Sequence, residues 1–327
     1  MPSTEPELLR PLIKLYIQLG GGVLLGWVLG RLVPKIVPTL IGQFLFWIGV
    51  PISIITFLRR ADLSGAIWIA PVAAWVAILL GAGLAWGWIK GQVLKRANNA
   101  DYPVSEQSVN FWSKPAQGSF LLSAMVGNTG YLGFPVTLTL VGEKYFGWAL
   151  FYDMLGTTIG AYGLGAVLAA RFGTQVKSQW QLVRAILYNP ALWSLGLGLG
   201  LRQVPLPEVT ERGLQGFAWS AIAFSLILIG MRLNQLTSWG RLRQASVSLG
   251  IKMLLVPLVV GIGLLQLGIT GQPQLVIVLQ MAMPPAFATL VLAEVFDLER
   301  DLTVTALAVG STGLLLTLPV WLLLFGR

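Results

Sequence analysis

Long apolar runs separated by short polar connections make up almost the whole chain. A helix needs roughly 20 mostly apolar residues to cross about 30 Å of hydrocarbon. The charge-free stretch from Met253 to Ala293 is too long for one span, and turn residues between Gly268 and Pro273 divide it. The pattern predicts ten membrane-spanning helices, near residues 9–31, 37–58, 65–89, 118–142, 146–170, 185–203, 213–233, 244–267, 274–296 and 302–325.

Two proline-containing motifs interrupt this pattern. Gly-Asn-Thr-Gly-Tyr-Leu-Gly-Phe-Pro runs from Gly127 to Pro135 in the fourth span, and Met-Ala-Met-Pro-Pro runs from Met281 to Pro285 in the ninth. An unpaired backbone group in hydrocarbon costs several kcal/mol, so a break needs protein or a water-filled cavity to satisfy the freed groups. A matched pair of breaks therefore indicates a binding site. The alternative is a pair of packing kinks, because proline is commoner in membrane helices than in soluble ones.

The ten spans divide into two sets of five around the polar connection from Arg171 to Arg184. Because five is odd, two similar halves would lie in the membrane in opposite orientations, as in many secondary transporters. The two breaks fall in equivalent spans of the halves. We therefore expect an all-α polytopic membrane protein with a single transmembrane domain, residues 1–327, made of inverted five-helix repeats at residues 9–171 and 182–326.

The break residues predict half-helices that end near the middle of the membrane. Proline removes a backbone donor and clashes with the carbonyl four residues earlier, so Pro135 should free the Tyr131 carbonyl. By the same rule Pro284 and Pro285 should free the carbonyls of Gln280 and Met281. Helix N-termini carry unpaired N–H groups and positive potential, which suits an anion. The geometry of the breaks is assigned to Gly127, Gly130, Gly133, Pro135 and Pro285.

Charged residues inside the spans are rare and informative. Asp153 lies about two turns into the fifth span, near Thr157, Thr158 and Tyr162. An intramembrane carboxylate is costly and is a functional hypothesis by default, here as a proton carrier or an ion ligand. The alternatives are hydration at the outer interface or an ion pair with a basic residue. Lys252 and Glu294 stand near span ends, where snorkelling to the interface explains them.

Composition and charge exclude several classes of function. The 327 residues are 55% hydrophobic and 11% charged, and they include no cysteine and no histidine. Disulfides, thiol chemistry, imidazole bases and the commonest zinc ligands are therefore absent, and no metal or cofactor is expected. A membrane-embedded aspartyl-type enzyme would need two facing carboxylates, but only Asp153 lies deep in a span. We therefore expect the protein not to be an enzyme.

The net charge of +9 reflects topology, not a nucleic-acid partner. The basic residues are scattered between spans, and most of the 22 Lys and Arg residues lie in the odd-numbered loops. Positive loops are retained in the cytoplasm, so both termini are expected outside a cell (plasma or inner) membrane that the chain crosses many times. The first residues lack the features of a cleaved signal peptide.

The motifs resemble those of the auxin efflux carrier family, which includes the plant PIN-formed carriers and many bacterial relatives. The Gly127 to Pro135 segment is similar to the family's Asn-Thr-x-x-x-Gly-x-Pro element. Further similarity covers nearly the whole chain in the same order, through Trp47 to Ser53, Asn189-Pro190, Ala223 to Leu233, Ala282 to Ala286, Leu292 to Glu294 and Ser311-Thr312. A departure is Ala223, where bacterial members often have proline, and this puts the bend of the seventh span in doubt.

This resemblance implies a ten-span carrier with crossed fourth and ninth helices, similar in fold to bile-acid symporters and sodium–proton antiporters. Spans 1, 2, 6 and 7 would form a scaffold, and spans 3 to 5 and 8 to 10 a moving unit. The substrate would be an organic anion, such as an auxin-like indole acid or a dicarboxylate, exported by alternating access. An anion channel and a sodium- or proton-coupled symporter of the bile-acid type are the alternatives.

The residues expected to bind the substrate lie at the breaks and in the scaffold spans. The family motif places Asn128 at the crossover, where its amide can donate to a carboxylate. Thr129 can donate through its hydroxyl, and Gln280 mirrors Asn128 in the other half. The full set is Asn128, Thr129, Gln280, Pro284, Ser225 and Ser53. The expected partners are the organic anion, the lipid bilayer and, as one candidate assembly, a second copy in a homodimer.

Overall fold

The computed structural model describes residues 13, 16–98, 112–173, 187–235 and 240–326. Within those ranges every regular element is a helix, and one isolated antiparallel β-bridge joins Gly127 to Pro285. The expected all-α class is confirmed for this part of the chain.

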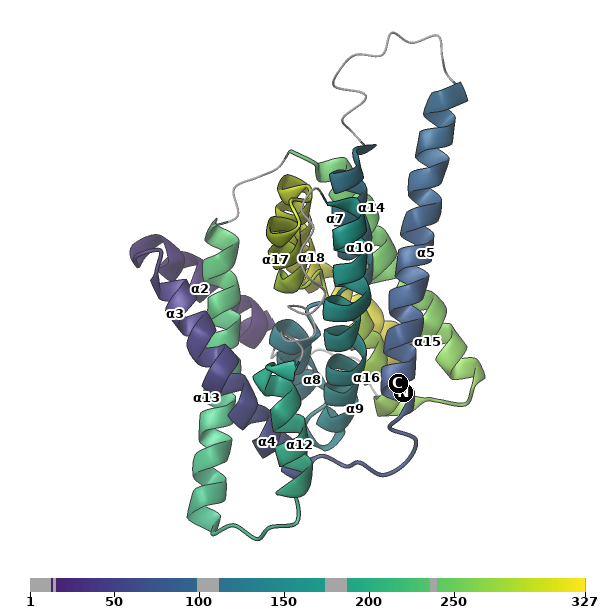
Figure 1. The fold of residues 1–327 in the computed structure, drawn as a ribbon. Coiled ribbons are helices and arrows are strands. Elements are labelled where there is room, and N and C mark those ends of the chain that lie inside the picture. The colour runs from purple at the N-terminus through teal and green to yellow at the C-terminus, as the bar shows by residue number, and fades with distance from the viewer. Residues whose placement is uncertain (1–12, 14–15, 99–111, 174–186, 236–239, 327) are drawn as a thin grey trace, which may run out of the picture.

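The first group of helices, on the left of Figure 1, comes from both halves of the sequence. Glycines allow the α2 and α13 backbones to approach closely, since a Cβ on Gly26 would lie 2.0 Å from the Ile227 carbonyl oxygen. Such small-residue contacts are typical of helix packing in membranes. The elements are η1 (Tyr16–Gly20), α2 (Gly21–Leu32), α3 (Val37–Phe44), η2 (Leu45–Gly49), α4 (Val50–Arg60), α12 (Pro190–Gly200) and α13 (Glu208–Gln235).

The second group contains the two interrupted spans and their neighbours (Figure 1). Its elements from the first half are α5 (Ile69–Asn98), α7 (Lys114–Met125), η4 (Thr129–Gly133), α8 (Phe134–Leu140), η5 (Glu143–Tyr145), α9 (Phe146–Phe151), η6 (Tyr152–Thr158), η7 (Ala161–Gly165) and α10 (Ala166–Phe172). Those from the second half are α14 (Leu242–Leu249), η8 (Gly250–Leu255), α15 (Val256–Gln266), α16 (Gly271–Met281), α17 (Phe287–Val295) and α18 (Arg300–Phe325).

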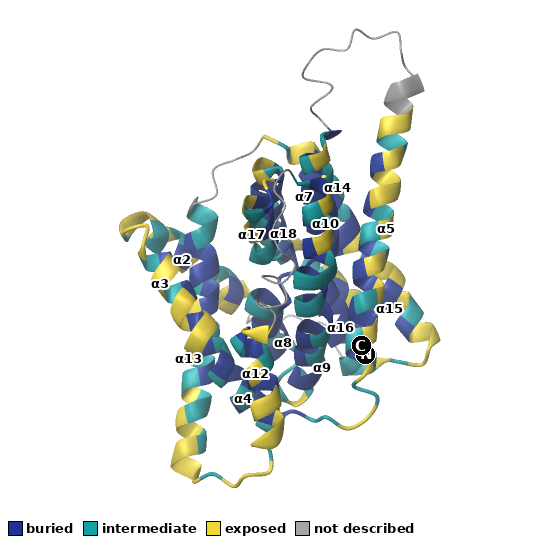
Figure 2. Cartoon of the chain, viewed as in Figure 1, coloured by how far each residue is buried: buried dark blue, intermediate teal, exposed yellow. Residues whose placement is uncertain are grey.

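The surface of the molecule fits a bilayer. Five continuous helical segments in the described ranges are long and apolar enough to cross a membrane: Val37–Arg60, Ile69–Leu94, Glu208–Asn234, Leu242–Gln266 and Arg300–Phe325. Their outward faces are apolar, with side chains such as Leu79, Ile262 and Leu316 exposed. Figure 2 shows that exposed residues lie along the outer helices, whereas α7 and α16 at the centre are mostly buried.

The turn that divides the long charge-free stretch is where the sequence predicts it. Helix α15 ends at Gln266 and α16 begins at Gly271. Gly268 and Gly271 have φ angles of 75° and 71°, which residues with a side chain rarely adopt. The glycines therefore set this boundary.

The fourth span is broken, but not at its proline. Helix α7 ends at Met125, Val126 is extended, and helical structure resumes at Thr129. Pro135 lies inside this helical stretch, where the π-helix η4 passes into α8. The break thus lies at Val126 to Asn128, at the start of the predicted segment Gly127 to Pro135, and Pro135 lies in the helical stretch that follows. In the ninth span the break does contain the prolines, between Met281 and Phe287.

Candidate functional site

The two breaks lie against each other and exchange backbone hydrogen bonds. The Asn128 N–H donates to the Pro284 carbonyl at 2.7 Å, and the Ala286 N–H donates to the Val126 carbonyl at 3.1 Å. Both strands of this short antiparallel bridge are extended, because neither segment can continue its helix. Each break thus pairs two backbone groups of the other, which lowers the cost of interrupting a helix in hydrocarbon.

The carbonyls that proline should free have found partners. The Tyr131 carbonyl, freed by Pro135, accepts from the Ser225 hydroxyl of α13 at 3.4 Å. The Met281 carbonyl, freed by Pro285, accepts from the Lys252 ammonium of η8 at 2.7 Å. Two of the three predicted carbonyls thus accept from donors on other spans, whereas the Gln280 carbonyl accepts from the Met283 N–H at 3.4 Å.

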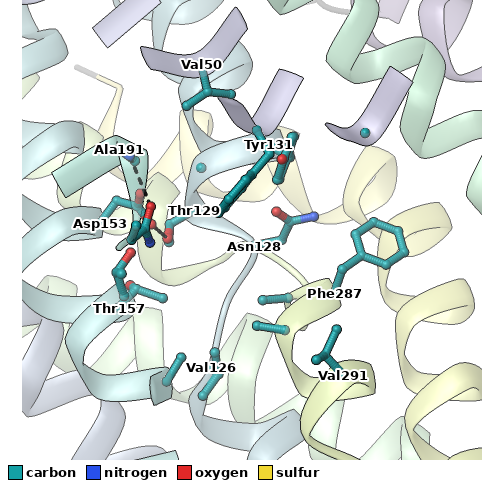
Figure 3. Close-up of a pocket in the computed structure, with 18 of the residues that line it drawn as sticks. Val50, Val126, Asn128, Thr129, Tyr131, Asp153, Thr157, Ala191, Phe287 and Val291 are labelled. Carbon is teal, nitrogen blue, oxygen red and sulfur yellow. Dashed lines mark hydrogen bonds between the residues drawn. The ribbon is translucent and has the colours of Figure 1, made fainter. Parts of the chain in front are cut away.

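A cavity of about 370 Å³ lies beside the paired breaks, between the two groups of helices. Figure 3 shows Asn128, Thr129 and Asp153 on one side of it and Phe287 and Val291 on another. The first residues of both half-helices, Thr129 and Phe287, belong to its wall. The other lining residues that matter below are Gly42, Tyr131, Tyr162, Asn189 and Arg232.

Asn128 presents an unused amide to this cavity. Its backbone N–H bonds to Pro284 and its carbonyl accepts from Leu132 and Gly133. Its side chain is 4% exposed and makes no cap to the η4 helix that follows. Among the described residues the Nδ2 atom has no hydrogen-bond partner. Since buried polar groups are nearly always paired, this donor is available for a ligand.

Asp153 lies across the same wall, in the π-helix η6. The Thr129 hydroxyl donates to its Oδ1 atom, and the side chain is only 6% exposed. Carbonyls of a π-helix are not positioned as they are in an α-helix. One of them, the Leu155 carbonyl, accepts from the Trp75 indole of α5 at 3.1 Å. No described Lys or Arg comes within 4.0 Å of Asp153, so an ion pair within the described part of the chain does not explain this carboxylate.

The positive charge of the cavity comes from Arg232 of α13. Its guanidinium carbon lies 4.8 Å from the centre of the Phe287 ring, at the start of α17. Gly42 of α3 makes room for it, because a Cβ there would lie 2.7 Å from Nη2. The guanidinium is thus wedged between α3 and α17 and faces the same space as the Asn128 amide. These donors and both helix N-termini all favour a negatively charged ligand.

The remaining predicted residues stand behind the cavity wall. Gln280 donates through Nε2 to the Thr137 hydroxyl at 3.0 Å and joins α16 to α8. Ser53 donates to the Gly49 carbonyl of its own helix at 2.7 Å, and Ser225 likewise bonds to Ile222. Pro284 takes part through its backbone. None of Ser53, Ser225, Gln280 or Pro284 lines the cavity, nor do Gly133, Pro135 or Pro285, whereas Gly127 and Gly130 do.

Two charged residues at the site are not apparent from the sequence pattern. Arg232 reads as one of the basic loop residues that set topology, although it lies within the helical α13. Lys252 reads as a snorkelling residue, but it is 3% exposed and bonds to the Met281 carbonyl, so that expectation is wrong. The sequence did contain one indication that Lys252 is buried, because this residue lies roughly two turns inside the predicted start of its span.

Two archaeal proteins are similar in sequence to this chain over most of its length. An uncharacterised transporter of the archaeon Methanothermobacter thermautotrophicus is 28% identical over 305 residues, which cover 91% of this chain and 93% of that protein. An uncharacterised transporter of Methanocaldococcus jannaschii is 25% identical over 215 residues, covering 62% of this chain and 67% of the relative.

The family model described as membrane transport protein matches residues 109–322, a stretch that contains both breaks, Asp153, Arg232 and Lys252. Most of the cavity wall and both half-helices therefore come from the matched region. The chain belongs to this membrane transport protein family, the auxin efflux carrier family that its motifs indicate.

Proposed function

We propose that this chain is a secondary transporter that exports an organic anion, bound in the cavity beside the paired breaks. The observation that carries the proposal is the unpaired, buried amide of Asn128 at the meeting point of two half-helices. The Arg232 guanidinium on the opposite wall adds a second donor for a carboxylate. An indole acid and a dicarboxylate are the two substrate types that we would test first.

The proposed architecture is two inverted five-helix repeats whose fourth and ninth spans cross. The equivalent positions of the breaks and the antiparallel bridge between them support it. The repeat boundaries would fall at residues 9–171 and 182–326, with both termini outside the cell membrane. A homodimer remains the assembly we would test first.

Alternating access is supported by a cluster of polar contacts that joins the two groups of helices near the Glu208 end of α13. Glu143 of η5 accepts from Gln215 and Trp219 of α13 at 3.0 and 3.1 Å. Its other oxygen lies 3.5 Å from Arg60 of α4. Gln215 and Trp219 lie roughly 20–25 Å along α13 from Arg232, at a rise of about 1.5 Å per residue. With the proposed topology, the cavity is nearer the cytoplasm and the Glu143 contacts close the outer end.

Asp153 is proposed as the group that couples transport to protons. It faces the cavity beside Thr129, where a bound anion would be a close like charge. A carboxyl group that gains or loses its proton with substrate binding would link the two fluxes. An anion channel would need no such coupling, and a membrane-embedded aspartyl enzyme would need a second buried carboxylate. In the described ranges Asp153 is the only buried acidic residue.

Substrate screening tests the proposal first. Malate, indole-3-acetate and their neutral amides should be compared for thermal stabilisation of the purified protein, since a ligand that binds the folded state raises its apparent stability. A stabilising anion should then show saturable exchange across reconstituted vesicles. Ohmic single-channel currents would favour the channel instead.

Asn128→Ala is the decisive variant for the site. Loss of one hydrogen bond to a charged group, about 1.5–3 kcal/mol, should reduce exchange by about tenfold or more. Asn234→Ala removes the same amide from the exposed end of α13, where it accepts from Arg31, and should transport as the wild type does. Equal flux in both variants would remove Asn128 from the site.

A further inference from the structure

Lys252 is a buried cation for which the proposed substrate site has no use. It lies in η8, in the middle of the continuous helical segment Leu242–Gln266, and is 3% exposed. It is the only basic residue that is buried in the described part of the chain, and no described carboxylate lies within 4.0 Å of its ammonium. A charge at this depth is expensive and calls for a function.

The ammonium group lies where the two breaks meet. Its Nζ donates to the Met281 carbonyl at 2.7 Å. Both Nζ and Cε lie 3.1 Å from the position that a Cβ on Gly127 would occupy, and the Met283 carbonyl oxygen is 3.4 Å from that same position. One side chain from a third span thus touches the first break and bonds to the second.

The electrostatics of this position favour a cation. Met281 is the last residue of α16, so its carbonyl lies at the negative end of that helix dipole. Pro285 has also removed the N–H that this carbonyl would otherwise accept. In transporters built from discontinuous helices, unwound carbonyls and half-helix C-termini of this kind coordinate Na⁺. Here a lysine ammonium occupies that environment.

Lys252 is separate from the substrate cavity. It is not among the lining residues, whereas Gly127, which it touches, is. The ammonium therefore lies behind the crossing, and it acts on the substrate site by holding the breaks in place. It is a positioning residue that does not contact the substrate.

We propose that Lys252 is a tethered cation, one that takes the place of a dissociable Na⁺ at the crossing, so that anion transport by this chain requires no Na⁺. This inference rests on the proposed function, and it separates this chain from a sodium-coupled symporter. The Lys252 side chain is present in every transport cycle because it is covalently part of the chain.

The wild-type protein provides the first test, which needs no variant. Anion exchange in reconstituted vesicles should be the same with Na⁺, K⁺ or N-methylglucamine as the cation. NaCl should raise the melting temperature of the purified protein no more than choline chloride does at equal ionic strength. Wild-type exchange that needs Na⁺ would overturn the inference, whereas absence of exchange with any anion would overturn the proposed function instead.

Lys252→Ala tests the charge itself. We expect exchange to fall by about tenfold, because the Met281 carbonyl at the buried end of α16 loses its charged hydrogen-bond donor. Methylammonium or ethylammonium, which fit the vacated space, should restore exchange and raise the melting temperature of this variant in a dose-dependent way. Absence of rescue by either amine would overturn the inference.

A second variant and a matched control allow the proposal to be tested even if Lys252→Ala folds poorly. Lys252→Met keeps the length of the side chain without its charge and should still lose exchange. Full exchange in Lys252→Met would contradict the proposal. Lys90→Ala, at an exposed position of α5, is the matched control and should behave as the wild type.

Discussion

The two breaks have similar backbones and different side chains. Each ends one half-helix, runs through an extended segment and begins another, and the two pair as an antiparallel bridge. The first break carries Asn128 and Thr129, which face the cavity. The second, from Ala282 to Ala286, has only alanine, methionine and proline side chains. Its polar contacts are made by its backbone, to Asn128 and to Lys252 at its edge.

This difference separates two requirements that a single break would have to meet together. An interrupted helix in hydrocarbon needs partners for its freed backbone groups, and the two breaks pair two such groups of each other. Ligand recognition requires polar side chains that are not already paired, and in the described site only the first break provides one. The second break contributes the N-terminus of α17, and Arg232 from α13 supplies a charge beside it.

The largest effect should come from removing that charge. Arg232→Gln keeps a hydrogen-bond donor beside Phe287 but loses the guanidinium, so the apparent affinity for the anion should fall about 10- to 100-fold, the equivalent of a charged hydrogen bond of about 1.5–3 kcal/mol. Concentration dependence of exchange measures it. Arg31→Gln, on α2 outside the cavity, is the control. Unchanged affinity in Arg232→Gln would leave the second break without an electrostatic role.

A glycine substitution tests the packing between the breaks. A Cβ on Gly133 would lie 2.2 Å from Oε1 of Gln280, whose amide bonds to Thr137. Gly133→Ala should therefore displace that buried amide and lower stability by about 1–3 kcal/mol. Gly163→Ala, with open space around it, should be neutral or slightly stabilising. Thermal unfolding in detergent compares the two, and equal melting temperatures would mean that the Gln280 contact does not hold the half-helices together.

Asp153 makes the first break sensitive to protons if the coupling proposal is correct. Exchange by the wild type should change several-fold between pH 5.5 and 7.5, and Asp153→Asn, which cannot ionise, should remove that dependence. The titratable groups close to it are Tyr131, Tyr152 and Tyr162, with Arg232 on the cavity wall. The tyrosines remain in the variant, so a pH dependence that persists in Asp153→Asn would assign it elsewhere.

Ser225 should have the smallest effect, because it only supports the backbone of the first break. Its hydroxyl also bonds within its own helix, to the Ile222 carbonyl at 2.7 Å, and its bond to Tyr131 is the longer one at 3.4 Å. Ser225→Ala should cost about 0.5–1.5 kcal/mol of stability and leave the affinity for the anion unchanged. A loss of affinity comparable to that of Arg232→Gln would place the serine in recognition, which the comparison of the breaks does not allow.

Local chemistry made the fold predictable in outline. Proline and glycine act on their immediate neighbours, so the sequence correctly indicated the turn at Gly268 to Gly271 and the carbonyls of Tyr131 and Met281 that need donors. The site was predictable in part for the same reason, since Asn128, Thr129 and Asp153 are polar residues in apolar surroundings. The exact position of the break within the segment Gly127 to Pro135 was not predictable, because Pro135 is accommodated inside the helical stretch that begins at Thr129.

What the sequence determined by itself is the set of interrupted helices, the polar residues of the first break and the membership of a transporter family. Tertiary structure alone decided that the breaks pair, that Ser53, Ser225 and Gln280 stand behind the cavity wall, and that Arg232 faces the cavity. It also decided that Lys252 is buried where the two breaks meet. The physical reason is that a hydropathy pattern records whether a residue is costly in hydrocarbon, whereas its partner comes from another span, distant in sequence, and is chosen only when the helices pack.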